Sequence, residues 1–306
     1  MSSTTKPLVT NPQELTSDNP PPLSEYNRQM LAEGDSWFTL GSLNIGQNSN
    51  LLFELQMKTR TAIINCAYPG DTLQRMVAGI NDRDFNLLLR VVPFAPVWAA
   101  IIVSAGGNDL IAAAELPLRS GDGQPTPLAE RLLLTPAEAA VVNPQAPTGA
   151  RHVSDAGWSR LEGFLLDNFR ALVSRRDQGP NEGQPLLLHT YAMPTVWAVG
   201  TVGAKNGWLF PAFEAAGIAP ADRQAVADEL FGRLRQLLLS LDQGSGHANA
   251  LPAVHVFDSA GTVQLVPPDP AATKSSGDWV NEIHPNRKGY RKLGAAMGRW
   301  IDGLLG

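Results

Sequence analysis

The sequence predicts an α/β fold, a three-layer α/β/α sandwich in which a mainly parallel β-sheet is covered by helices on both faces. Short apolar runs of strand length alternate along the chain with longer segments that carry apolar residues at helical spacing. The first two runs each end in a glycine-containing turn, which is typical of a strand that leads into a helix. This alternation indicates βαβ units, whose strands form a parallel sheet buried on both faces.

The predicted elements follow one another along most of the chain. Buried strands are expected at residues 61–67, 97–104, 186–191 and 253–258. Helices are expected at residues 71–80, 154–175, 220–241 and 285–305. The third helix begins with Pro220 near its first turn, and Val226, Leu230 and Leu234 lie on one of its faces.

The length of the chain favours a single domain. A chain of 306 residues and 32.8 kDa can bury a large core, so we expect one α/β domain over residues 27–306. Residues 1–26 are polar and rich in proline, and they are expected to form an extended N-terminal arm without a packed element. The arm has no apolar stretch of signal-peptide length, and no run reaches the roughly 18 apolar residues of a membrane span. We therefore expect a cytoplasmic protein with no membrane span.

Charge and cysteine content exclude several kinds of partner. A net charge of −5 with 17% charged residues leaves no basic stripe that could follow a phosphate backbone, so nucleic acid is not expected as a partner. Cys66 is the only cysteine, which excludes an internal disulfide and a metal site built from cysteines. No set of His, Asp and Glu residues has the spacing of metal ligands, so we expect neither a metal nor a cofactor. The sequence makes no prediction of the oligomeric state.

Residues 116–150 interrupt the alternation of strands and helices. Prolines and glycines recur through this segment, which indicates a long insertion with one short helix at residues 136–142. Such an insertion is either a lid or wall beside a site or a plain solvated excursion, and both alternatives stay open. Residues 200–213 contain Trp208 and Phe210 and are a candidate for a second wall.

Four small-residue motifs carry candidate chemistry. They are Ser36 in Gly34-Asp35-Ser36, Gly70 in the turn after the 61–67 strand, Asn108 in Gly106-Gly107-Asn108-Asp109, and His284 before Pro285. A hydroxyl nucleophile, donors for an oxyanion and a histidine base are the groups that acyl transfer requires. Each motif alone also fits a helix cap or a plain turn, so their order and their spacing carry the argument.

In this order the motifs resemble the conserved blocks of the SGNH (GDSL-type) serine hydrolase and esterase family. The resemblance spans roughly residues 30–300 and implies the flavodoxin-like SGNH hydrolase fold. It also implies a carboxylic ester hydrolase that forms an acyl-enzyme on Ser36 and acts on small-molecule esters. His284 would be the base, and the amide of Gly70 and the side chain of Asn108 would form the oxyanion hole.

One position departs from the family pattern. The family places an aspartate three residues before the histidine, to hold the imidazole in the right tautomer and to stabilise its charged form, and Asn281 stands there in this chain. Either a Ser-His pair suffices, or Asp278 or Glu282 takes the role. Asp278 is favoured because the extended segment that it begins could fold back toward the imidazole. The alternatives are that Asp278 caps a turn and that Glu282 pairs with Arg287 or Lys288 on the surface.

Two competing functions follow from the same residues. The missing aspartate is the best argument for a catalytically weak or inactive binding protein on the SGNH fold. A nucleotide-dependent α/β enzyme has no support, because neither a Gly-x-Gly-x-x-Gly turn nor a P-loop is present. Trp37 either lines an apolar cleft together with Trp208 or packs behind the serine. His189 either belongs to the core or lies at the rim of the pocket.

Overall fold

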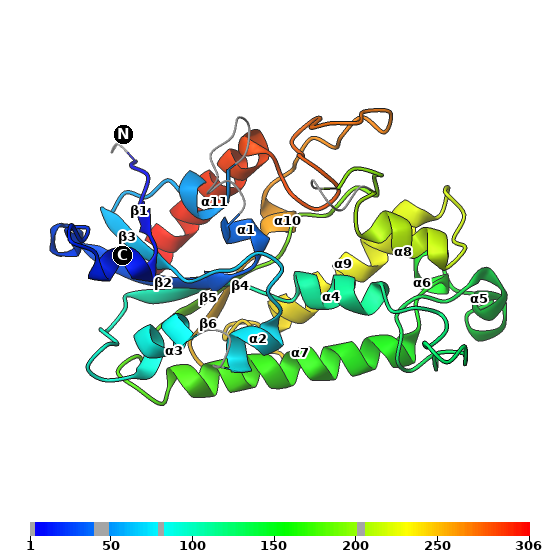
Figure 1. The fold of residues 1–306 in the computed structure, drawn as a ribbon, viewed down its shortest axis with the longest axis horizontal. Helices are drawn as coiled ribbons and strands as arrows, with labels where there is room; N and C mark the ends of the chain where they lie inside the picture. Colours follow the sequence, from blue (N-terminus) through cyan, green and yellow to red (C-terminus); the bar gives the residue numbers. More distant parts are fainter. Residues whose placement is uncertain (1–3, 40–48, 79–82, 201–205) are drawn as a thin grey trace.

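The computed structural model describes residues 4–39, 49–78, 83–200 and 206–306. Six strands form one sheet in the order β1-β3-β2-β4-β5-β6, and all neighbouring strands are parallel. The strands are β1 (Leu8–Thr10), β2 (Arg28–Gly34), β3 (Thr61–Asn65), β4 (Ala100–Ser104), β5 (Leu186–His189) and β6 (Val254–Phe257). Helices lie on both faces of this sheet (Figure 1), so the predicted three-layer α/β/α sandwich is confirmed.

The two helical layers come from different parts of the chain. Below the sheet in Figure 1 lie α2 (Leu73–Ala78), α3 (Arg83–Arg90) and α7 (Asp155–Arg176), and above it lie α1 (Ser36–Thr39) and α11 (Arg287–Leu305). The helices α4 (Gly107–Ala114), α8 (Leu209–Ala215) and α9 (Arg223–Ser240) contact one another. The shorter helices are η1 (Pro12–Thr16), η2 (Leu23–Glu25), η3 (Leu52–Glu54), α5 (Pro136–Val142), α6 (Thr148–Arg151) and α10 (Ser259–Thr262).

The predicted elements agree with the observed ones to within a few residues. The four predicted strands are β3, β4, β5 and β6, and three of the predicted helices are α7, α9 and α11. The helix expected at residues 71–80 is α2, and its positions 79 and 80 lie outside the described residues. The start of α7 illustrates the local signal, because the side chain of Ser154 accepts the amide of Gly157 as an N-cap.

The interpretation of residues 1–26 as an arm without a packed element is wrong for its first part. Strand β1 pairs with β3 at the edge of the sheet, from Leu8 beside Ala62 to Thr10 beside Ile64. An edge strand needs main-chain hydrogen bonds on one side only, so three residues form it without a long apolar run. The sheet therefore begins before residue 27.

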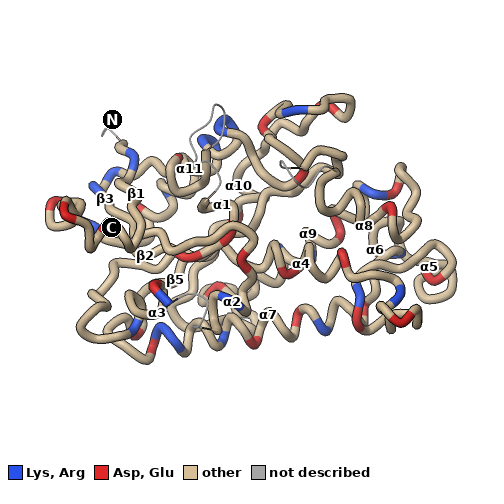
Figure 2. Tube along the Cα trace, viewed as in Figure 1, with Lys and Arg blue, Asp and Glu red and all other residues tan. Residues whose placement is uncertain are grey.

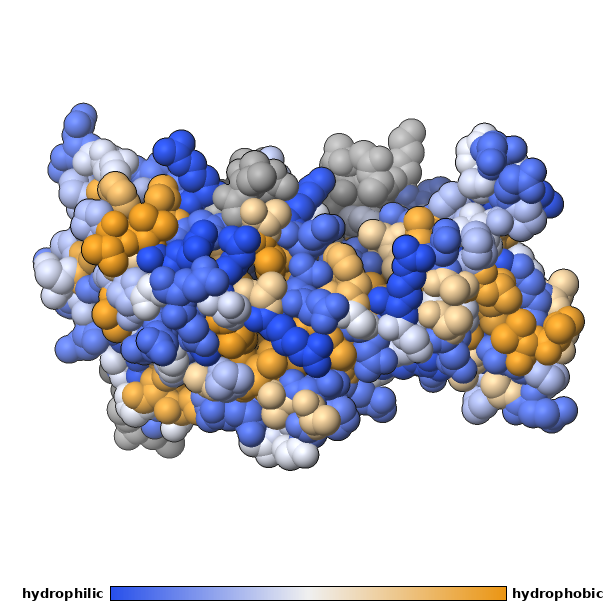
Figure 3. Space-filling view, turned by 90° about the horizontal axis from the view of Figure 1, so that it is seen from below, coloured by the Kyte–Doolittle hydropathy of each residue, from blue (hydrophilic) through white to orange (hydrophobic). Residues whose placement is uncertain are grey.

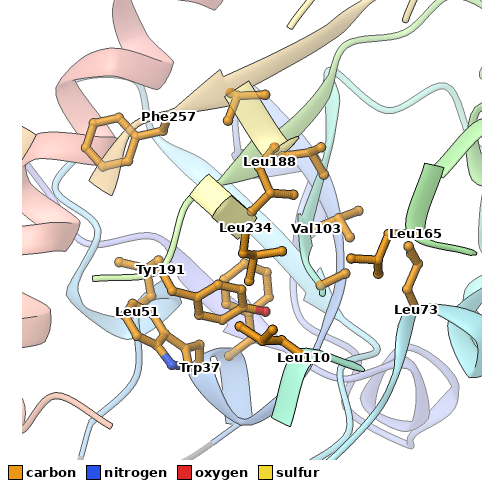
Figure 4. Close-up of a cluster of buried hydrophobic side chains, with 14 of the residues drawn as sticks. Trp37, Leu51, Leu73, Val103, Leu110, Leu165, Leu188, Tyr191, Leu234 and Phe257 are labelled. Atoms are coloured by element: carbon orange, nitrogen blue, oxygen red, sulfur yellow. The ribbon is translucent and has the colours of Figure 1, made fainter. Parts of the chain in front are cut away.

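The core lies between the sheet and the helices on each face. All five residues of β4 are buried, as expected for a parallel strand covered on both sides. Figure 4 shows Val103 and Leu188 from two strands close to Leu165 of α7 and Leu234 of α9. This packing fixes the carboxyl ends of the strands, which carry the candidate site.

The insertion at residues 116–150 lies at one end of the molecule, around α5 (Figure 1). It contains the short helix predicted at residues 136–142, which opens with a capping box between Thr135 and Glu138. Part of it is solvated, since Val141 is exposed. Leu132, in contrast, lines a cleft of about 340 Å³ together with residues of α4 and α7. The insertion thus combines a solvated excursion with one side of this cleft, whose lining does not include Ser36, Asn108 or His284.

The surface mixes charged and apolar side chains. Lysine and arginine are interspersed with aspartate and glutamate along the trace (Figure 2). Apolar side chains reach the surface in several patches on the face seen from below (Figure 3). Within the described ranges, no helix combines the length and the apolar character needed to cross a membrane.

Candidate active site

The candidate site lies where the order of the strands reverses. Strands β3 and β4 lie on opposite sides of β2, so a crevice opens at the carboxyl ends of β2 and β4. Ser36 follows β2 directly, and Asn108 lies in the first turn of α4 after β4. Close approach of the two strand ends requires Gly34, because a Cβ atom there would lie 2.8 Å from the Cβ of Ser104.

The structure brings Ser36 and His284 together across the length of the chain. The Oγ atom of Ser36 lies 2.7 Å from Nε2 of His284, a hydrogen-bond distance between residues 248 positions apart. The imidazole is buried, whereas Ser36 is only partly covered. A hydroxyl that reaches solvent next to a buried ring nitrogen is the geometry of a nucleophile and its base.

Asn281 orients the imidazole. Its Oδ1 atom lies 2.9 Å from Nδ1 of His284 and also accepts the backbone amides of Ile283 (3.2 Å) and His284 (3.0 Å). Because two main-chain N–H groups point at this atom, it is the amide oxygen, and Nδ1 must carry the proton that it donates. Nε2 is then free to accept the hydroxyl proton of Ser36.

The choice of Asp278 as the orienting carboxylate is wrong. The segment does fold back as expected, but in this hairpin the amide of Val280 donates to the carbonyl of His284 at 2.9 Å. This pairing places Asp278 beside Asn286, whose amide donates to the carbonyl of Asp278 at 2.8 Å. The carboxylate of Asp278 accepts the amide of Val266 at 2.7 Å and forms an ion pair with Lys292.

Glu282 neither orients the ring nor forms the expected surface ion pair. It is fully buried, and its carboxylate accepts the backbone amides of Trp197 (3.3 Å), Trp208 (2.5 Å), Leu209 (2.8 Å) and Phe210 (2.9 Å). Burial raises the pKa of Glu282 to about 7, against the opposing effect of these amides. No sequence signal links Glu282 to this group, because its partners lie 72 to 85 positions away.

The two predicted oxyanion donors lie on neighbouring segments. Asn108 donates its side-chain amide to the carbonyl of Asp71 at 2.8 Å, and it lines the same small hollow as Ser36. Gly70 has a φ of 77° in a turn closed by the amide of Asp71 and the carbonyl of Tyr68 (3.2 Å), as in a type II turn. The roles of Gly70 and Asn108 as donors stay predictions.

The comparisons with known proteins give a distant likeness. No family model matches the chain, and no curated protein matches it. Similar solved structures include an extracellular lipase from Streptomyces rimosus, at 13% identity over 90% of this chain and 99% of that chain, with a TM-score of 0.45. A phospholipase A1 from Streptomyces albidoflavus NA297 is 12% identical over 90% of this chain and 98% of that chain, with a TM-score of 0.42. A GDSL-like lipase from Bacteroides thetaiotaomicron VPI-5482 is 12% identical over 95% of each chain, with a TM-score of 0.39.

The strand order and the positions of the motifs decide the kind of fold. Ser36 and Asn108 flank the point where the strand order reverses, and His284 precedes the last helix. The chain has a three-layer α/β/α fold, the architecture that the resemblance to the SGNH hydrolases implies.

A buried aspartate supports the turn that carries Ser36. The carboxylate of Asp35 accepts the amide of Trp37 (2.9 Å), the hydroxyl of Ser104 (2.9 Å) and the hydroxyl of Tyr191 (2.5 Å). Burial raises the pKa of Asp35 to about 6, although these three donors oppose the shift. Ser104 and Tyr191 were not predicted as site residues, and their only signal is that each stands at or just after the end of a strand.

His189 belongs to the core behind the site. Its ring lies 5.5 Å from that of Trp37 and 5.3 Å from that of Tyr191, and Nδ1 lies 3.0 Å from the carbonyl of Thr190. Its Nε2 atom is buried and has no hydrogen-bond partner among the described residues. Trp37 is buried as well, so most of it packs behind the serine, and its remaining surface borders the small hollow that Ser36 and Asn108 line. Burial lowers the pKa of His189 to about 4.

We expect His189→Phe to remove part of the acid sensitivity of the fold. An unfolded histidine binds a proton below a pKa of about 6.5, whereas buried His189 resists protonation down to about 4. The side chain therefore lowers the free energy of unfolding by about 2 kcal/mol between about pH 7.5 and about pH 5. Urea unfolding should show the variant gaining that amount relative to the wild type as the pH falls. His247→Phe, in an exposed loop, is the control, and identical pH dependence of His189→Phe and the wild type would contradict the assignment.

Among the residues with assigned positions, no three His, Cys, Asp or Glu side chains are grouped as ligands of a metal ion would be. The site brings together a hydroxyl, an imidazole and a side-chain amide donor. These groups suit acyl transfer through a covalent serine intermediate.

Proposed function

We propose that the protein is a serine hydrolase that cleaves carboxylic esters through an acyl-enzyme on Ser36. The observation that carries this proposal is the 2.7 Å contact between Oγ of Ser36 and Nε2 of His284, with Nδ1 engaged by Asn281. The ring is thus supplied in the tautomer that accepts the hydroxyl proton. Burial lowers the pKa of His284 to about 3, so the imidazole is neutral and available as a base near neutral pH.

The reaction has two halves. Oγ of Ser36 attacks the ester carbonyl while Nε2 of His284 takes the proton, and the carbonyl oxygen becomes an oxyanion. The amides of Ser36 and Gly70 and the side chain of Asn108 would stabilise this charge. The bond to the alcohol then breaks, and the imidazolium returns its proton to the leaving oxygen. Water attacks the acyl-enzyme in the same way and restores the free hydroxyl.

Asn281 leaves the site without a negative charge beside His284. An amide oxygen orients the imidazole but carries no negative charge to offset the imidazolium that forms in each half-reaction. This is also the observation that favours the second candidate function, a binding protein of the same fold with little or no activity. The two functions differ in whether Ser36 turns over an ester.

We expect Asn281→Asp to raise turnover. A carboxylate at this position would accept the same three N–H groups and would stabilise the protonated ring, since an opposite charge within hydrogen-bond distance shifts a pKa by about 1 to 3 units. The value of kcat/KM for p-nitrophenyl acetate should increase by about tenfold or more. Asn281→Ala, which removes the orienting group, should reduce it. A folded Asn281→Asp protein with unchanged or lower kcat/KM would show that charge compensation does not limit the reaction.

A panel of p-nitrophenyl esters with acyl chains of increasing length tests the proposed function. Hydrolysis that depends on Ser36 would support the enzyme, and the dependence on chain length would define the size of the acyl group that fits. Equal rates in the wild type and in Ser36→Ala would remove the enzymatic proposal in favour of the binding protein.

A further inference from the structure

A buried carboxylate holds one wall of the site in place. The side chain of Glu282 is completely buried and accepts four main-chain amides, from Trp197 and from three successive residues that begin with Trp208. The amide of Glu282 itself donates to the carbonyl of Val199 at 3.0 Å. Both the side chain and the main chain of this residue thus connect the histidine segment to the segments around Val199 and Trp208.

The approach of the carboxylate depends on a glycine. Gly207 has a φ of 82°, and a Cβ atom there would lie 2.5 Å from Oε2 of Glu282. A side chain at this position would therefore displace the carboxylate or the segment that begins at Trp208. Gly207 therefore leaves the space that the carboxylate of Glu282 occupies.

The chemistry of the contact requires a carboxylate. Four N–H groups converge on two oxygen atoms, and above its pKa of about 7 the ionised carboxylate accepts at both atoms without donating. A glutamine in place of Glu282 would present its NH₂ group to some of these donors and would leave them unpaired in a buried place. Unpaired buried donors are costly, so the segment would move.

The segment that Glu282 holds carries an aromatic wall beside the base. The ring of Trp208 lies 5.3 Å from the imidazole of His284, centroid to centroid, with an angle of 75° between the planes. Trp208 is partly exposed, so a substrate can reach part of its side chain. In ester cleavage the oxygen of the leaving alcohol must lie within hydrogen-bond reach of His284, because the imidazolium protonates it. The wall beside the imidazole therefore faces the alcohol.

We propose that Glu282 is a positioning residue that fixes Trp208 as the wall for an apolar leaving alcohol. The proposal rests on the proposed function and extends it to the alcohol side of the ester. Glu282 does not touch the substrate, and it acts through the placement of Trp208. Esters of bulky apolar alcohols should be preferred over esters of small alcohols with the same acyl group.

Competition between benzyl acetate and ethyl acetate measures this preference. The two esters share the acyl group, so differences in their cleavage report the alcohol pocket. The measured quantity is the kcat/KM for benzyl acetate divided by the kcat/KM for ethyl acetate. Trp208→Ala should lower the ratio by about tenfold, a size typical of losing one apolar contact in a pocket. Glu282→Gln should lower it by a similar factor, and the double variant should show no further loss, since both changes affect the same wall. Additive losses, or an unchanged ratio in Glu282→Gln, would overturn the proposal.

Two further variants separate positioning from general damage. Gly207→Ala disturbs the same contact from the other side and should also lower the ratio, so it replaces Glu282→Gln if that variant does not fold. Trp208 is the N-cap of helix α8, and Glu214 lies exposed near the other end of this helix. Glu214→Gln should leave the ratio unchanged. The reaction of Ser36 with a small fluorophosphonate should also keep its wild-type rate in Glu214→Gln.

Hydrogen exchange tests the contact without relying on catalysis. The amides of Trp208, Leu209 and Phe210 should be protected in the wild type and should exchange at least about tenfold faster in Glu282→Gln, as expected when a buried hydrogen bond is lost. If exchange is faster in Glu282→Gln but the wild type cleaves no ester, the proposed function is contradicted and the contact of Glu282 with the Trp208 segment stands. Unchanged exchange in an active protein would overturn the role of Glu282 alone.

Discussion

Replacing Ser36 by alanine is expected to reduce ester hydrolysis by at least about 1,000-fold, to a rate close to that of the buffer. The variant lacks the oxygen that forms the acyl-enzyme, while His284 and the amide donors remain. Any residual rate would come from water attacking a bound ester next to these donors. Initial rates with p-nitrophenyl acetate measure the effect, because this ester is small and reactive.

The control for this prediction is a serine outside the site. Ser120 lies in the exposed insertion, so Ser120→Ala should retain wild-type turnover. Circular dichroism and thermal unfolding establish that both variants are folded. Comparable turnover of folded Ser36→Ala and Ser120→Ala would exclude Ser36 as the nucleophile.

Asn108→Ala is expected to lower kcat by about 100- to 1,000-fold with a small change in KM, because an oxyanion donor acts mainly in the transition state. The same side chain binds the carbonyl of Asp71 at 2.8 Å in the resting protein, so the change also removes one link to the Gly70 turn. A lower melting temperature reports the loss of this link. Steady-state kinetics report the loss of the donor.

Asn168→Ala is a matched control for Asn108→Ala. Asn168 lies partly exposed on α7 and also donates its side-chain amide to a main-chain carbonyl, that of Phe164 at 2.8 Å. This variant loses the same kind of hydrogen bond far from the serine, so kcat should not change. If Asn108→Ala behaved like Asn168→Ala, the oxyanion would have to be stabilised by backbone amides alone.

Much of the site was predictable because it consists of short motifs at the ends of strands. The apolar runs before Gly70 and Asn108 identified their strands, and parallel strands place their carboxyl ends at one edge of the sheet. The resemblance to the SGNH hydrolases then implied that His284 acts on Ser36, and the two side chains do lie within hydrogen-bond distance. Local signals sufficed for Gly70 and Asn108 because each lies a few residues after a predicted strand, whereas strand β2, which precedes Ser36, was not among the predicted strands.

The features that were not predicted depend on strand register and on contacts between residues far apart in the sequence. The pairing of Val280 with His284 in the hairpin decides which side chain faces the ring. The choice of Asp278 was wrong because the sequence does not predict this pairing. The sequence predicts a surface position for Glu282, because its four amide partners lie far away in the chain. Strand β1 was missed because three residues at a sheet edge produce no periodic pattern.

Covalent labelling with a fluorophosphonate probe, followed by peptide mapping, tests most directly whether the imidazole activates the hydroxyl. We expect one modified residue, Ser36, in the wild type. We expect no label at this position in Ser36→Ala and a labelling rate at least about 100-fold lower in His284→Ala, since general-base assistance contributes about that much. If the wild type stays unlabelled at Ser36, or if His284→Ala is labelled as fast as the wild type, His284 does not activate Ser36.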